Sequence, residues 1–109
     1  MKNILEMSSY SSKNLDGTRS ISIVDNYAYV VSSISDSLTI LDISDVRNII
    51  ELDSFTSVNL DGATGMSVIN NLIYITSHTA DSLTISDVID VNNLTIVESY
   101  TTDSLDGAT

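Results

Sequence analysis

Few side chains in this sequence are of a type that carries out chemistry. His78 is the only histidine and the chain has no cysteine, so a histidine-based metal site would need carboxylates or a second chain to complete its ligands. Serines are abundant, but none stands in the G-x-S-x-G turn of a hydrolase, and the four glycines form no phosphate-binding loop. Because one unrepeated histidine does not make a catalytic triad, we expect no enzyme activity, no cofactor and no metal site.

Arg19 and His78 are the two candidates for ligand binding. Arg19 stands just before a predicted strand; there it binds an anion if it faces a channel, and is otherwise a solvated or salt-bridged side chain. His78 lies in a polar stretch, where an exposed loop histidine is the plainer interpretation. Both residues break the internal repeat described below, since Thr64 corresponds to Arg19 and Ser33 to His78.

The charge of the chain is strongly negative and limits its partners. Fifteen acidic side chains against four basic ones give a net charge of −11, and the last basic residue is Arg47. Nucleic acid binding needs clustered Lys and Arg, and a membrane helix needs about 20 consecutive apolar residues. We therefore expect neither nucleic acid binding nor membrane insertion. The N-terminus lacks the apolar stretch of a signal peptide, and the cellular compartment stays unknown at this point.

An internal repeat of 45 residues organises the whole chain. The triplet Leu-Asp-Gly begins at Leu15, Leu60 and Leu105, and residues 15–59 laid over 60–104 without a gap give 18 identities. The first 14 residues obey the same period. Repeats of this kind indicate one supersecondary unit copied along the chain. We therefore divide the chain into four parts: residues 1–14 as the outer strand of a preceding blade, 15–59 and 60–104 as two blades, and 105–109 as the start of a further repeat.

Each unit contains four short strands rich in Ile, Val and Thr, which favour a pleated surface. Strands are predicted at 20–24, 27–31, 38–43 and 49–55, at 66–69, 72–76, 83–88 and 94–100, and at 4–10 as a further fourth strand. Asp-Asn and Asn-Asn pairs between the first two strands predict tight turns. No stretch has a helical apolar stripe longer than two turns, so the fold class is all-β.

Four strands every 40–45 residues are typical of the four-stranded antiparallel blades of a β-propeller. The residues 27–31, Tyr-Ala-Tyr-Val-Val, followed at 38–45 by Leu-Thr-Ile-Leu-Asp-Ile-Ser-Asp, resemble the LVIVD repeat, whose blades contain YAYV and LVIVDVSD. The segments 73–75 and 83–88 are a looser match. The resemblance implies a propeller-like fold with no common catalytic residues, and it suggests an extracellular or cell-surface protein.

Two blades do not close a ring, because propellers have typically 4–8 blades. The missing blades are therefore expected from other copies of this chain or from the rest of a longer propeller, and the strand 4–10 is suited to complete a blade of another chain. An open array of stacked blades is the alternative fold. The recurring residues Asp16, Asp61 and Asp106 are expected in turns, and the equivalent residues Tyr29 and Tyr74 are expected to pack between sheets.

Two functions remain open from the sequence. The first is a non-catalytic structural or interaction module, whose partner is another copy of the chain, a protein or a glycan. The second is a ligand-binding or enzymatic propeller, whose site is formed by loops at the ring centre and includes Arg19 or His78. Fold class alone does not choose between them.

Overall fold

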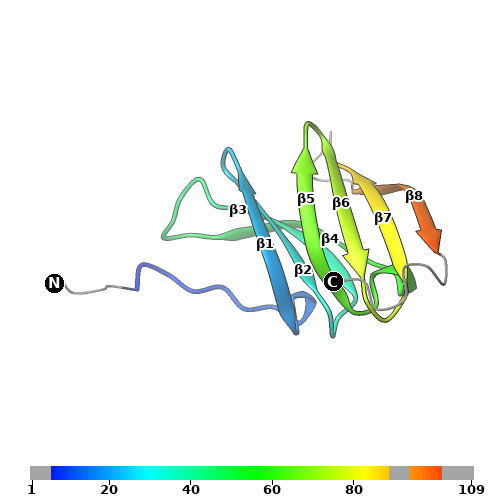
Figure 1. The fold of residues 1–109 in the computed structure, drawn as a ribbon. Helices are drawn as coiled ribbons and strands as arrows, with labels where there is room; N and C mark the ends of the chain where they lie inside the picture. The colour runs from blue at the N-terminus through cyan, green and yellow to red at the C-terminus, as the bar shows by residue number, and fades with distance from the viewer. Residues whose placement is uncertain (1–5, 89–93, 102–109) are drawn as a thin grey trace, which may run out of the picture.

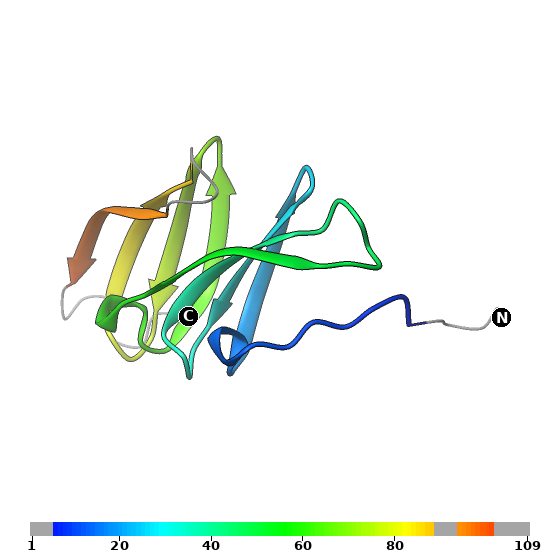
Figure 2. The ribbon, with the colours of Figure 1, turned by 180° about the vertical axis from the view of Figure 1, so that it is seen from behind.

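The chain forms two four-stranded antiparallel sheets that lie side by side in the computed structural model, which describes residues 6–88 and 94–101 (Figures 1 and 2). The first sheet contains β1 (Thr18–Val24), β2 (Tyr27–Ser32), β3 (Ser37–Asp42) and β4 (Ile50–Thr56), and the second contains β5 (Ala63–Ile69), β6 (Leu72–Ser77), β7 (Ser82–Asp87) and β8 (Thr95–Thr101). The strands of each sheet follow one another in chain order. The described residues include no α-helix, and therefore none that could cross a membrane. The predicted all-β class and the two four-stranded units are confirmed.

The turns between strands use residues that tolerate left-handed backbone. Asp25 and Asn70 join the first two strands of each sheet, and Asp36 and Asp81 join the second and third, all with φ between 52° and 56°. Asp and Asn enter this region more readily than other side chains do. The repeat therefore places the same turn chemistry at the same point of each sheet.

A short 3-10 helix precedes each sheet, and the sequence did not predict it. These helices are η1 (Lys13–Leu15) and η2 (Val58–Leu60), and each ends at the leucine of a Leu-Asp-Gly triplet, whose aspartate is the C-cap. The glycine that follows has φ of +73° at Gly17 and +72° at Gly62. The turn role expected of Asp16 and Asp61 is thus observed, whereas Asp106 and the segment 105–109 lie outside the described residues.

The main core lies between the two sheets. Val31, Leu38 and Ile40 of the first sheet are fully buried there against Ile73 and Ile75 of the second. The core is closed at one end by Leu60, which extends from η2. The inner strands of the two sheets are the closest, since β1 and β2 contact β5. Tyr29 packs in this core as expected, but its equivalent Tyr74 is only half-buried, because it lies on the opposite face of the second sheet.

The strand expected at residues 4–10 is not formed over the part that the structure describes. Residues 6–12 have no strand pairing, and residues 4 and 5 lie outside the described residues. A fourth strand needs the hydrogen-bonding edge of a third strand beside it, and the third strand before this segment would belong to a preceding blade. The segment instead contacts the first sheet through Tyr10, which packs against the buried cluster of Ala28, Val30 and Leu41.

Candidate functional site

Arg19 and His78, the two candidates from the sequence, line the same hollow although they belong to different sheets. The hollow has a volume of about 440 Å³ and lies where the start of β1 meets the start of β5 and the end of β6. Its described lining residues are Arg19, Ser33, Gly62, Thr64, His78 and Thr79. The fold thus brings together two side chains that the sequence could nominate only one by one.

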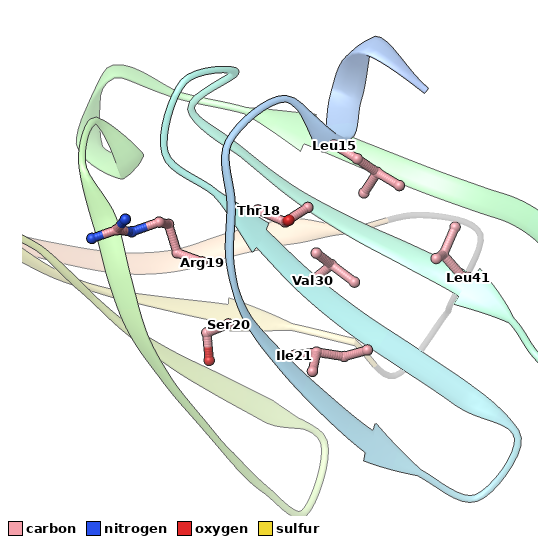
Figure 3. A pocket seen from close by; sticks show the side chains of 7 residues that line it. All are labelled: Leu15, Thr18, Arg19, Ser20, Ile21, Val30 and Leu41. Carbon is pink, nitrogen blue, oxygen red and sulfur yellow. The ribbon is translucent and has the colours of Figure 1, made fainter. Parts of the chain in front are cut away.

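A β-bulge at the start of β1 positions Arg19. Thr18 pairs with Ser32 and Ser20 with Val31, so Arg19 is the extra residue of its strand. Such a bulge re-aims a side chain away from the regular alternation of the strand. Figure 3 shows the Arg19 side chain pointing away from the apolar residues around it. The bulge therefore explains why an arginine can face the gap between the sheets.

The second sheet has the same bulge at Thr64. Ala63 pairs with Ser77 and Gly65 with Thr76, so Thr64 is the extra residue of β5. The hydroxyl oxygen of Thr64 is buried and has no hydrogen-bond partner. A hydroxyl group can both donate and accept hydrogen bonds, and this one is left available beside the hollow.

His78 is held by the turn that follows β6. Its backbone N–H donates a hydrogen bond to the carbonyl oxygen of Gly62, with 2.9 Å between the two atoms. The equivalent bond in the first sheet joins the N–H of Ser33 to the carbonyl oxygen of Gly17, also at 2.9 Å. The two turns therefore share this backbone hydrogen bond, and the residue that donates it is serine in the first sheet and histidine in the second.

The described lining of this hollow combines basic side chains with hydroxyl groups. No carboxylate is among its described lining residues, although the whole chain has a net charge of −11. Within residues 6–88 and 94–101, no three His, Asp or Glu side chains lie close enough to hold a metal ion. The arrangement offers a guanidinium, an imidazole and hydroxyls, which are groups that bind anions.

A second hollow lies on the free face of the first sheet, and the sequence analysis missed it. It has a volume of about 630 Å³, and Figure 3 shows Leu15, Ile21, Val30 and Leu41 around it. Ile21 alternates with serine along β1, which is the signal by which its exposed position could have been found. The other described lining residues of this second hollow are polar, namely Thr18, Arg19 and Ser20, so that Arg19 borders both hollows.

The N-terminal segment covers one end of this free face. The Tyr10 hydroxyl donates a hydrogen bond to Glu51 Oε1 at 3.1 Å, and the Asn14 side chain donates to Glu51 Oε2 at 2.9 Å. Partial burial, followed by the hydrogen bond and negative charge of Glu51, raises the pKa of Tyr10. The phenol therefore stays protonated and keeps its role as donor at neutral pH.

One comparison with known proteins gives a match, and this match covers the first sheet. The family model described as the LVIVD repeat matches residues 17–57, which include β1 to β4 entirely. No curated protein and no solved structure matches the chain. The match thus covers one complete four-stranded unit, and the second unit follows it at the same 45-residue spacing.

Proposed function

This chain carries a repeat of the LVIVD family, and we propose that it is a non-catalytic structural module of propeller-type blades that completes its stack of sheets with further copies of itself. Repeat units of this kind bury their faces only against neighbouring units. Two outer faces are left at the ends of a two-blade stack. The single observation that supports the proposal concerns the residues of these two outer faces. They are the 45-residue equivalents of the residues that already pack between the two sheets of the chain.

The outer face of the second sheet is the more open one. Strands β2 and β3 are buried along nearly their whole length, whereas in β6 and β7 buried residues alternate with half-buried ones. The half-buried residues are the 45-residue equivalents of core residues of the first sheet: Tyr74 of Tyr29, Thr76 of Val31, Leu83 of Leu38 and Ile85 of Ile40. This face is therefore built like one that already packs against a blade.

The free face of the first sheet is the complementary one. Ile21 and Ile23 are 60% exposed there, and their equivalents Met66 and Val68 pack against the core between the two sheets. Leu15, which borders this face, is likewise the equivalent of the fully buried Leu60. The free face of the first sheet therefore resembles the inner face of the second sheet, which packs against the core residues of the first sheet.

A head-to-tail arrangement follows from these two matches. The second sheet of one copy would dock on the first sheet of the next copy and repeat the contact that the chain makes internally. Such a contact is heterologous, so it continues until a ring closes or a filament forms. With two blades per chain, a ring of about 4–8 blades contains about two to four copies.

Two complementary substitutions test this arrangement. Ile85→Lys places a charge on the docking face of the second sheet, and Ile21→Lys places one on the docking face of the first. Burying an unpaired lysine against an apolar partner is unfavourable, so each variant alone should be a monomer of 11.8 kDa in light scattering. An equal mixture of the two variants should form a dimer, because each supplies the intact face that the other lacks.

Val58→Lys is the matched control, since Val58 is 81% exposed and its equivalent in the preceding repeat is Lys13. It should associate like the wild type. A wild-type chain that stays folded and monomeric at all concentrations would contradict self-assembly and would favour blades of a different sequence as partners. If Ile85→Lys alone remains fully associated, the contact does not use the second sheet as proposed.

A further inference from the structure

The hollow that contains Arg19 and His78 differs in charge from the rest of the molecule. The chain has 15 acidic and 4 basic side chains, yet this hollow has an arginine and a histidine and no carboxylate among its described lining residues. An arginine offers five N–H donors in a planar fork that fits the oxygens of a carboxylate or a phosphate. The local surroundings are therefore suited to an anion in a protein that otherwise repels anions.

The internal repeat provides a control for what the fold itself requires at these positions. Arg19 and Thr64 are equivalent residues at equivalent bulges, and both line the hollow. Because threonine occupies the same bulge in the second sheet, the bulge does not require an arginine. The charge of Arg19 is thus an addition that backbone geometry does not explain.

The same comparison applies to His78 and Ser33. Both follow the second strand of their sheets, both make the same 2.9 Å backbone hydrogen bond to a glycine, and both line the hollow. Serine satisfies this turn in the first sheet, so the turn does not require a histidine. The two replacements that introduce nitrogen donors therefore come from different sheets and converge on one place.

A hydroxyl without a partner adds a further donor to this place. The Thr64 hydroxyl oxygen is buried and makes no hydrogen bond, and buried polar atoms without partners are uncommon in folded proteins. Because Thr64 and Arg19 line the same hollow, this hydroxyl is a donor in reach of the place where an anion would bind.

We propose that the hollow between the two sheets, lined by Arg19, Thr64 and His78, binds an oxyanion such as a phosphate, a sulfate or a carboxylate group. The Arg19 guanidinium supplies the charge-assisted hydrogen bonds, and the His78 imidazole and Thr64 hydroxyl supply further donors. The site lies within one chain, so it does not depend on the association proposed above. This binding extends the function of the module beyond assembly.

The test is a titration of the ¹⁵N-labelled chain with inorganic phosphate at constant ionic strength, followed by NMR. We expect saturable shifts of the Arg19 side-chain Nε–H signal and of the backbone amides of Thr64, His78 and Thr79. For an open site with a few charge-assisted hydrogen bonds, the Kd should be on the order of 1 mM. Parallel titrations with sulfate and acetate distinguish a tetrahedral oxyanion from a carboxylate, and sodium chloride measures the general effect of salt.

The repeat also supplies the variants. Arg19→Thr and His78→Ser each introduce the residue that the other blade has at that position, so both should fold. Arg19→Thr should weaken binding at least about tenfold and His78→Ser about threefold, whereas Arg47→Gln, outside the hollow, should bind like the wild type. The proposal is overturned if no oxyanion gives saturable shifts, or if Arg19→Thr binds as tightly as the wild type.

Discussion

The carboxylate of Asp53 accepts a hydrogen bond from the backbone N–H of Leu94, with 2.8 Å between Oδ2 and the nitrogen. Asp53 belongs to β4 of the first sheet, and Leu94 stands just before β8 of the second. The bond therefore joins the outer-strand regions of the two sheets, whereas the inner strands β1 and β5 contact each other directly. Asp53 also accepts a 2.9 Å hydrogen bond from the N–H of Ser54 through Oδ1.

Asp53→Ala should lower the free energy of unfolding by about 1–2 kcal/mol, because the buried N–H of Leu94 would lose its charged acceptor. Asp53→Asn keeps one acceptor oxygen and should lose about half as much. The matched control is Glu98→Ala, since Glu98 is the exposed equivalent of Asp53 in the second sheet. Its effect should stay within about 0.5 kcal/mol. Urea unfolding measures all three, and an equal loss for Glu98→Ala would contradict this role of Asp53.

Asp36 and Asp61 form a like-charged contact between the two sheets. Asp36 lies in the turn between β2 and β3, and Asp61 follows η2. Burial, followed by the charge of Asp61 and a hydrogen bond to it, raises the pKa of Asp36. A raised pKa in the folded state means that protonation of Asp36 favours folding. This contribution is fully present below the pKa of the unfolded chain and is lost as the pH rises through the folded value.

Asp36→Asn should therefore stabilise the protein at pH 7, by about 0.5 kcal/mol for an accessible charge pair. Asparagine also tolerates the φ of 54° at this position. Near pH 3, where Asp36 is largely protonated, the gain should disappear. Thermal unfolding at the two pH values measures the difference. Asp25→Asn is the control for the turn itself, since Asp25 has the same backbone conformation; a gain of equal size there would show that the charge of Asp61 is not the cause.

The architecture was largely predictable from the sequence because its signals are local and repeated. The alternation of Ile and Ser in β1 and the Asp and Asn turn residues determine the hairpins, and the 45-residue period copies them. The 3-10 helices were missed, since a three-residue helix has no apolar periodicity to detect. The segment at 4–10 forms no strand over its described part, and its expected pairing with a blade of another chain stays a prediction, because strand propensity alone does not supply a partner edge.

The site was predictable only in part. Sequence reasoning selected Arg19 and His78 as breaks in the repeat, but it could not place them in one hollow. Their convergence depends on the β-bulge at Arg19 and on the packing of β1 beside β5, which are relations across the chain. The hollow beside Ile21 was missed for a different reason. Whether an alternating strand buries one face or both depends on how many neighbouring sheets are present.

The N-terminal segment should compete with the association of copies. Tyr10 packs on the free face of the first sheet, and it is the equivalent of Phe55, which packs on the core between the two sheets, and of Tyr100 in β8. In the head-to-tail arrangement, Tyr100 of a second copy would reach the place where Tyr10 lies. Both side chains cannot occupy it, so the segment must move before a copy docks fully.

Deletion of residues 1–11 should therefore strengthen association, lowering the protein concentration at the midpoint of assembly by about tenfold, which corresponds to about 1.4 kcal/mol. The same deletion should lower the stability of the monomer, because Val30 and Leu41 lose part of their cover. Light scattering over a range of concentrations measures the first effect, and unfolding of the dilute protein measures the second. Tyr10→Phe removes the hydrogen bond to Glu51 but keeps the ring, so it should leave association unchanged. If the deletion weakens association instead, the segment is part of the contact between copies and completes a blade of the neighbouring chain.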